Sequence, residues 1–185
     1  MNPKRRNFLQ TSTAAGLAGL ALPTAQAKNN ELADKLEKAM LAPVLRRELF
    51  KQPIKIAALD LLKNGKSYLV RARSADGVTG FSEAHSAVMS AAYPILVKKV
   101  APSFLGKDAR DLESLLNEVY LAQSNYKWQG LPFWVSVAAV EIAILDLLGK
   151  TAGKPLGELF GKVIRREIPV YRASGNRGNT PEAEI

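Results

Sequence analysis

Residues 133–161 constrain the fold of this chain more than any other segment. Between residues 135 and 148 the only polar side chains are Ser136, Glu141 and Asp146. A helix that is apolar on nearly all sides is normally buried inside a protein. We therefore predict a core helix in this segment, and we expect the other elements to enclose it.

The two ends of this helix also carry sequence signals. Pro132 precedes the apolar run, and Gly149 and Lys150 follow it. Glycine tolerates the backbone conformation that ends a helix, and a lysine stabilises the negative end of the helix dipole. These residues predict a helix that ends near Gly149. The apolar run is too short and too acidic for a membrane span, so we expect none there.

The composition excludes several classes of site. The chain has 185 residues, no cysteine and a single histidine, His85. Disulfides, thiolate zinc sites and sites built from several imidazoles are therefore excluded. The formal charge of +9 favours anionic ligands. The basic residues form no stripe interleaved with aromatic ones, so we expect no nucleic-acid partner.

Residues 1–27 have the order of parts found in an export signal. A basic region at Lys4, Arg5 and Arg6 precedes a weakly apolar stretch, and the small residues at 25–27 fit a cleavage site. Arg5 and Arg6 resemble the twin-arginine signal motif. We predict a twin-arginine-type signal peptide, export to the periplasm and no stable membrane span in the mature protein. A disordered basic tail or a short anchor helix is the alternative.

Residues 28–52 are predicted to form a linker or lead-in helix. Leu32, Leu36 and Met40 recur every four residues, as they would on one face of a helix. Pro43 interrupts the pattern, because proline has no backbone N–H to continue the helix.

Residues 53–84 alternate between apolar and polar side chains, as strands do. The pairs Asn64-Gly65 and Asp76-Gly77 are turn signals that divide this stretch into three segments. One covered face and one exposed face are typical of an antiparallel sheet. We therefore predict a three-stranded meander. The residues expected to face inward are Ile54, Ile56 and Ala58 on the first strand and Tyr68, Val70 and Ala72 on the second.

From residue 86 onward the apolar pattern becomes helical. We predict one helix from about Ser90 to Val100, with Pro94 near its first turn, where proline is tolerated. Asp108 is expected to cap the next helix. Strands followed by helices predict an α+β fold, a meander and then a helical bundle on one sheet face. The apolar stripe of the capped helix consists of Leu112, Leu115, Leu116, Val119 and Tyr120.

Residues 162–185 are predicted to begin a second domain. Residues 168–172 are a short extended run, and Thr180, Pro181 and Glu182 have the features of a helix start. A strand, a loop and a helix start are half of a βα unit, which cannot bury its apolar face alone. We therefore expect the chain to be truncated.

The core-helix segment resembles the signature of the mandelate racemase and muconate lactonizing enzyme family, in the enolase superfamily. Ser136 and Ile144 are mild departures from that signature. The meander ending at residues 80–83 and the stretch 165–171 agree with the family in the same order, so the resemblance covers roughly residues 53–182. The matching residues are Ala138, Ala139, Val140, Glu141, Ala143, Asp146, Leu147, Gly149, Lys150, Pro155, Leu156, Leu159, Phe160 and Gly161.

The resemblance implies a two-domain enzyme. Residues 53–161 correspond to the family's α+β capping domain, and residues 162–185 to the first strand of its (β/α) barrel. In the family the barrel holds Mg²⁺ and the bases that remove a proton next to a carboxylate. The resemblance therefore assigns no catalytic residue and no metal ligand to this chain. The chain alone is expected to be inactive and to bind no Mg²⁺.

In this family two cap loops close over the barrel and select the substrate. Here they correspond to residues 63–67 and 85–89, which makes His85 and Ser86 candidate substrate-binding residues. The alternative for His85 is an exposed loop histidine with no contact to a substrate.

Tyr171 and Arg172 lie at the expected end of the first barrel strand, where barrel active sites are found. The planar guanidinium group of Arg172 suits a substrate carboxylate, and an interdomain salt bridge is the alternative. Glu141 and Asp146 are the family's two signature acids. Five helical residues separate their directions by about 140°, so we expect structural roles rather than a shared metal.

The resemblance implies a small carboxylate substrate and a homo-oligomer. The implied reactions are dehydration, racemisation, epimerisation and cycloisomerisation, and we favour dehydration of an acid sugar. The alternative is a stand-alone periplasmic binding or interaction module that reuses the fold of the cap.

Overall fold

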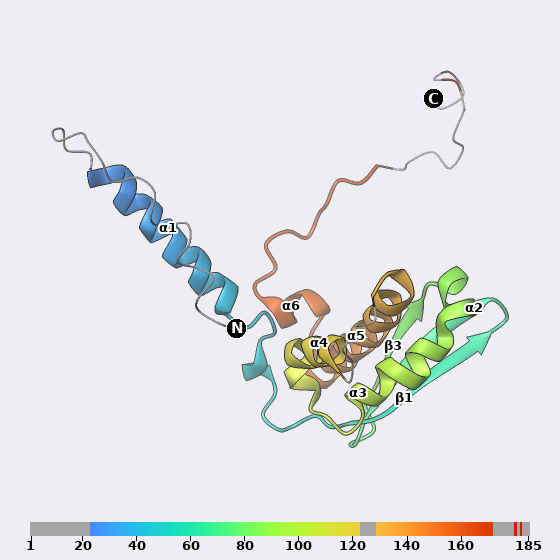
Figure 1. The fold of residues 1–185 in the computed structure, drawn as a ribbon. Coiled ribbons are helices and arrows are strands. Elements are labelled where there is room, and N and C mark those ends of the chain that lie inside the picture. The colour runs from blue at the N-terminus through green and yellow to red at the C-terminus, as the bar shows by residue number, and fades with distance from the viewer. Residues whose placement is uncertain (1–22, 123–128, 172–179, 181, 183–185) are drawn as a thin grey trace. The chain divides into compact units, whose positions relative to one another are not determined.

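The computed structural model describes residues 23–122, 129–171, 180 and 182, and its chain divides into two compact units, Met1–Ala42 and Pro43–Ile185. The first unit contains helix α1, Pro23–Leu41, drawn in blue in Figure 1. This helix confirms the pattern of Leu32, Leu36 and Met40, and it ends two residues before Pro43. It runs through the predicted cleavage position after residue 27, which remains a prediction.

The second unit is built on a three-stranded antiparallel sheet. Its strands are β1, Ile56–Asn64, β2, Ser67–Ser74, and β3, Thr79–Ala84, in the order β1-β2-β3. The predicted meander is therefore confirmed. On β2 the inward positions predicted for Tyr68, Val70 and Ala72 are buried, as expected.

The first strand departs from the predicted alternation at a β-bulge. Ile56 is paired with Ser74, but Ala58 is paired with Arg73, so one extra residue lies on β1. An extra residue moves every later side chain to the opposite face. Ile54 and Ile56 are buried as predicted, whereas Ala58 faces outward, and that part of the prediction was wrong. Beyond the bulge, Leu59 and Leu61 pack against the core instead.

The helices cover one face of this sheet, as an α+β fold requires (Figure 1). The core between the two layers contains the buried faces of β2, β3, α2, α4 and α5. The helical segments are η3, Arg47–Leu49, α2, Ser86–Ile95, η4, Leu96–Val100, α3, Ala101–Phe104, η5, Ala109–Asp111, α4, Leu112–Leu121, α5, Leu131–Ala152, and α6, Leu156–Phe160.

Helix α2 starts earlier than predicted. It begins at Ser86 rather than near Ser90, so Pro94 lies close to its end and not in its first turn. A proline inside a helix removes one backbone hydrogen bond and crowds the preceding turn. The chain accommodates this with the π-helical turn of η4, which begins two residues after Pro94.

Asp108 caps the short helix η5, which leads directly into α4, so the predicted cap lies one short helix earlier than expected; the N-cap of α4 is Asp111. The carboxylate of Asp108 accepts hydrogen bonds from the backbone N–H groups of Arg110 and Ile54, at 3.0 Å and 3.1 Å. Burial opposes the charge of Asp108, but its bonds to the Arg110 guanidinium and to these backbone groups lower its pKa below the ordinary value. Asp108 therefore joins the segment before β1 to the helical layer. Leu112, Leu115 and Val119 of α4 are buried.

Helix α5 is the predicted core helix. It has 22 residues, which is long enough for a membrane span, so the expectation that it would be too short was wrong. Eleven of these residues are nevertheless buried within the domain. The helix also continues past Gly149, which is buried, and ends at Gly153 with a φ of 62°. Gly153, rather than Gly149, therefore provides the left-handed conformation that ends the helix.

Strand β3 lies unusually close to α5. A Cβ atom added at Gly80 would lie 2.1 Å from the carbonyl oxygen of Ala143 and 2.3 Å from the backbone nitrogen of Leu147. Only glycine allows this approach of two backbones. Two residues further along β3, the hydroxyl of Ser82 donates a hydrogen bond to the carbonyl oxygen of Ala139.

Polar groups of α5 bind the open edge of the same strand. The carboxylate of Asp146 accepts hydrogen bonds from the backbone N–H of Phe81, at 2.8 Å, and from the Lys150 ammonium, at 2.7 Å. Lys150 also donates to the carbonyl oxygen of Thr79, at 3.1 Å. Two groups on the open edge of β3, the N–H of Phe81 and the carbonyl oxygen of Thr79, are thus bonded to α5.

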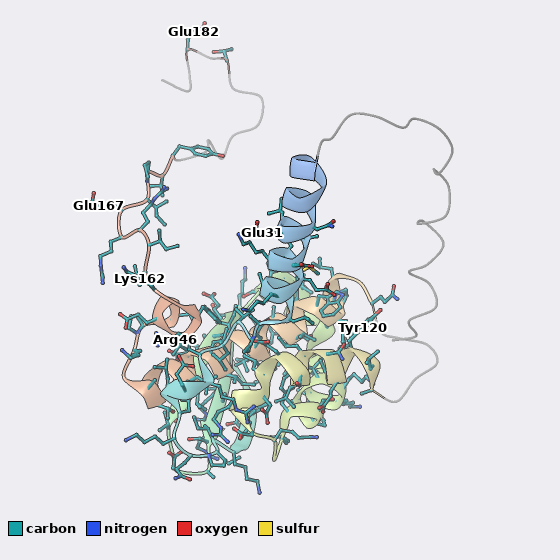
Figure 2. The ribbon with its side chains drawn as sticks, turned by 90° about the vertical axis from the view of Figure 1, so that its left-hand side faces the viewer. Glu31, Arg46, Tyr120, Lys162, Glu167 and Glu182 are labelled. Atoms are coloured by element: carbon teal, nitrogen blue, oxygen red, sulfur yellow. The ribbon has the colours of Figure 1, made fainter. Side chains whose placement is uncertain are left out.

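The segment after α6 is not regular. No strand forms within residues 162–171, so the predicted first barrel strand is absent from the part of the chain that the structure describes. Figure 2 shows Lys162 and Glu167 projecting from this segment. Ile164, Ile168 and Val170 are exposed. A strand requires a neighbouring strand for its hydrogen bonds, and none pairs with this segment among the described residues. The predicted helix start at residues 180–182 lies mostly outside the described residues.

We predict that Gly80→Ala destabilises the domain by about 3 kcal/mol or more, because the added methyl group forces β3 and α5 apart. Gly157→Ala is the matched control. Its Cβ would be 3.9 Å from the nearest heavy atom, a Val163 side-chain carbon. The control should leave the stability unchanged or raise it slightly. Urea denaturation followed by circular dichroism measures both effects, and equal midpoints for the two variants would contradict the prediction.

Replacing Glu141 or Asp146, the two acids of α5, by the neutral amide should change the stability of the domain in opposite directions. Burial raises the pKa of Glu141, so its charged form costs stability at neutral pH. Glu141→Gln should therefore stabilise the domain at pH 7, and the gain should shrink as the pH falls below the raised pKa and vanish below the ordinary pKa of a glutamate. Asp146→Asn should destabilise it by about 0.5–1 kcal/mol, because the Lys150 pair is lost. Denaturation midpoints across pH test this, and effects of the same sign at pH 7 would refute it.

Candidate functional site

A tight turn brings the ends of β1 and β2 together. Asn64 is paired with Ser67, which leaves Gly65 and Lys66 as the two residues of the turn. Gly65 has a φ of 57°, in the left-handed region that a two-residue hairpin turn needs. The predicted hairpin signal at residues 64–65 is therefore confirmed.

The start of α2 is fixed by His85. Its side-chain Nδ1 accepts a hydrogen bond from the backbone N–H of Val88, at 3.4 Å, and its carbonyl oxygen accepts one from Met89, at 2.8 Å. His85 is thus the N-cap of the helix. The expected second loop at residues 85–89 is in fact this cap and the first turn of α2, because the helical pattern starts immediately after β3.

A groove lies between the hairpin turn and the first turns of α2. Its volume is about 420 Å³. The two segments that were predicted to select a substrate therefore lie on opposite sides of one hollow. The residues that line the groove are Lys63, Gly65, Lys66, Tyr68, Ser86, Ala87 and Ser90. Ammonium, hydroxyl and backbone N–H groups make this a lining rich in hydrogen-bond donors.

Strand pairing sets the floor of the groove. Lys63 is paired with Tyr68, and Tyr68 with Ala84, so the three residues form one row across the sheet. The Tyr68 side chain is buried, and the ammonium nitrogen of Lys63 lies 5.4 Å from the centre of its ring. A cation over an aromatic face is held by the ring's electrostatic field. Lys63 is therefore directed over Tyr68, at the side of the groove.

Only some of the predicted substrate-binding residues lie at the groove. Ser86 lines the groove and is half-buried, and His85 is exposed at the residue before it. Tyr171 is 90% exposed and does not line the groove. The assignment of a substrate role to each of these residues stays a prediction.

Three further predicted residues, Arg5, Arg6 and Arg172, lie outside the described residues. Lys63 and Lys66 lie within the predicted cap loop at residues 63–67 but were not predicted individually, and Tyr68 was predicted only as an inward-facing strand residue. The hairpin signal placed the turn correctly, but the face on which Lys63 lies depends on the bulge in β1.

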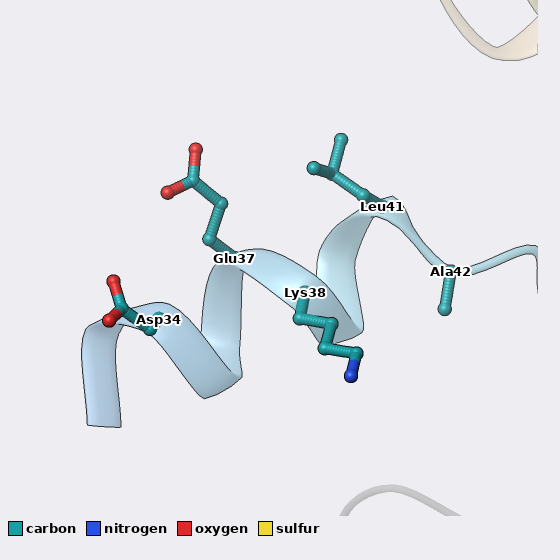
Figure 3. Close-up of a pocket in the computed structure, with 5 residues that line it drawn as sticks. All are labelled: Asp34, Glu37, Lys38, Leu41 and Ala42. Atoms are coloured by element: carbon teal, nitrogen blue, oxygen red, sulfur yellow. The ribbon is translucent and has the colours of Figure 1, made fainter. Parts of the chain in front are cut away.

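A larger hollow, of about 530 Å³, lies along helix α1. Figure 3 shows that Glu37 and Leu41 point to one side of this helix and Lys38 to the other. Among the described residues only α1 and the residue after it line the hollow, which makes it a poor candidate for a small-molecule site. Its lining residues are Asp34, Glu37, Lys38, Leu41 and Ala42.

The signature acids do not form a metal site. Asp146 is bound to Lys150 and to the backbone of β3, as described above. Within the described ranges, no group of three or more histidine, cysteine, aspartate or glutamate side chains is placed to hold a metal ion. The structural role expected for Asp146 agrees with its contacts.

Comparison with characterised proteins gives similar enzymes of sugar-acid metabolism. A D-galactonate dehydratase family member from Paenibacillus sp. (strain JDR-2) is 30% identical over 117 residues, which cover 62% of this chain and 28% of that protein. A D-mannonate dehydratase from Caulobacter vibrioides is 33% identical over 102 residues, which cover 52% of this chain and 24% of that protein. The matches thus involve less than a third of each relative.

Among solved structures, a mandelate racemase/muconate lactonizing protein from Paracoccus denitrificans PD1222, complexed with magnesium, has a similar fold. The TM-score is 0.50 with 26% identity, over 60% of this chain and 31% of that protein.

A family model covers most of the second unit. Residues 44–161 match the N-terminal domain of the mandelate racemase / muconate lactonizing enzyme family, which is more than half of the chain. The matched region contains the meander, the groove and the core helix α5. The family assignment from residues 138–161 is therefore confirmed: the chain belongs to the mandelate racemase / muconate lactonizing enzyme family and carries its N-terminal capping domain.

Proposed function

We propose that this chain is the substrate-capping part of an acid-sugar dehydratase. The groove between the hairpin turn and α2 is the observation that carries the proposal. It brings together the two segments that cap the active site in this family. Its donor-rich lining suits a polyhydroxylated acid, whose hydroxyl oxygens accept hydrogen bonds. The similar D-galactonate and D-mannonate dehydratases support this substrate class.

The cap would position the substrate rather than take part in bond making or breaking. A rigid hairpin and a capped helix start can orient the distal part of a substrate and exclude water from its reacting end. Lys63 and Lys66 would contact the substrate from the turn, and Ser86 and Ser90 from α2.

We propose that the whole enzyme uses Mg²⁺, in line with the magnesium complex of the Paracoccus protein. The part of the chain that the structure describes has no group of side chains that fits this ion. Its ligands would therefore come from a barrel domain, and the chain alone would be inactive.

The test is to read the gene beyond the codon for Ile185 and to assay its entire product. We expect the reading frame to continue into a barrel, and the purified protein to convert an acid sugar into a keto acid by loss of water. Chelation should abolish turnover, and added Mg²⁺ should restore it. The 185-residue chain, assayed in parallel, should show no turnover.

Two results would overturn the proposal. One is Mg²⁺-dependent turnover by the 185-residue chain alone. The other is a stop codon after Ile185 together with a soluble, monodisperse product, which would indicate a stand-alone periplasmic module.

We also propose that the chain is exported by the twin-arginine route. The basic region with Arg5 and Arg6, followed by a weakly apolar stretch, supports this. Replacing both arginines, by Arg5→Lys and Arg6→Lys, should retain the protein in the cytoplasm. Replacing Lys4 by Arg is the control and should leave export intact. Cell fractionation measures the outcome, and equal periplasmic levels of all variants would refute this route.

A further inference from the structure

The groove contains cations without matching anions. Lys63 and Lys66 both line it, and no carboxylate is among its lining residues. Neither lysine makes an ion pair within the described parts of the chain, whereas Lys150 and Lys154 on α5 and the turn after it each pair with an acid. A donor-rich hollow with two unpaired ammonium groups attracts negative charge.

The opposite side of the groove adds to the positive electrostatic potential of the two lysines. Ser86 and Ala87 are the first two residues of α2, whose ten residues give its N-terminus a partial positive charge. An acidic side chain in the first turn would normally compensate this charge, but α2 has none there. His85 satisfies the backbone N–H of Val88 only, which leaves the amides of Ser86 and Ala87 without an intrahelical acceptor.

The sheet holds the two sides at a fixed separation. The row Lys63, Tyr68 and Ala84 runs across all three strands, and α2 starts two residues after Ala84. The position of the Lys63 backbone relative to the helix start is therefore determined by strand register, and the Tyr68 ring directs its ammonium group. This preorganisation lowers the cost of collecting like charges around a ligand.

Resting on the proposed function, we propose that the groove binds an anionic group at the end of the substrate opposite to the reacting carboxylate. The substrate is then an acid sugar with a second acidic group, either a carboxylate or a phosphate. The two ammonium groups compensate its charge, and the hydroxyls of Ser86 and Ser90 with the first amides of α2 donate hydrogen bonds to its oxygens. A substrate that ends in a neutral hydroxyl group would leave both lysines uncompensated.

The test is a binding titration of the intact 185-residue chain, followed by the backbone amide signals in NMR spectra at constant ionic strength. The probes are galactarate, which has a carboxylate at each end, inorganic phosphate, and galactitol, the neutral polyol of the same length. We expect galactarate or phosphate to shift the amides of Lys66, Ser86 and Ala87 in a saturable manner, and galactitol to leave them unchanged. A response to galactarate indicates a diacid, and a response to phosphate alone indicates a phosphorylated acid.

The double variant Lys63→Gln with Lys66→Gln should weaken this binding about tenfold. Lys51→Gln with Lys98→Gln is the matched control, because it removes the same charge at exposed positions outside the groove and should leave binding unchanged. Equal weakening by both variants, equal shifts with galactitol, or no shift at the groove with either anion would overturn the inference.

Failure of this inference and failure of the proposed function give different results. One result is that the groove binds neither anion while the full-length gene product dehydrates acid sugars that have one carboxylate. This result would refute only the inference that the substrate carries a second acidic group. Anion binding in the groove of a protein without any dehydratase activity would refute the proposed function.

Discussion

The close contact between β3 and α5 is the constraint on which the rest of the domain depends. Because Gly80 has no side chain, the strand backbone reaches the helix backbone at Ala143 and Leu147. Asp146 and Lys150 then form hydrogen bonds with two groups on the open edge of the strand. A single strand and a single helix are thereby joined by both packing and polar bonds, and the sheet cannot shift along α5 without losing both.

Much of this fold could be predicted because local patterns and the final packing agree. The alternation on β2 and the apolar stripe of α4 each indicated the correct buried face. The bulge in β1 could not be predicted, because no glycine or other local signal marks the extra residue between Ile56 and Ala58. The start of α2 was also misplaced. Pro94 was expected near a helix start, whereas a π-helical turn accommodates it near the helix end.

The candidate site was predicted as two segments and a few side chains, of which Ser86 lines the groove and Tyr171 does not. The hairpin signal and the family resemblance placed residues 63–67 and 85–89 near a substrate, and the groove lies between these segments. The contribution of Lys63 depends on which face of β1 it occupies, and the bulge decides this. The bulge at the far end of β1 thus determines that the Lys63 side chain lies on the face of the strand that borders the groove.

The same register fixes the backbones on the two sides of the groove relative to each other. The groove is set between a two-residue turn and a helix start that are linked through the row of Lys63, Tyr68 and Ala84. Ser82, two residues before Ala84, is bound to α5, so this row is tied to the core helix. The strand register therefore holds the backbone positions around the groove before any ligand binds. Less of the binding free energy of a ligand would be spent on ordering them.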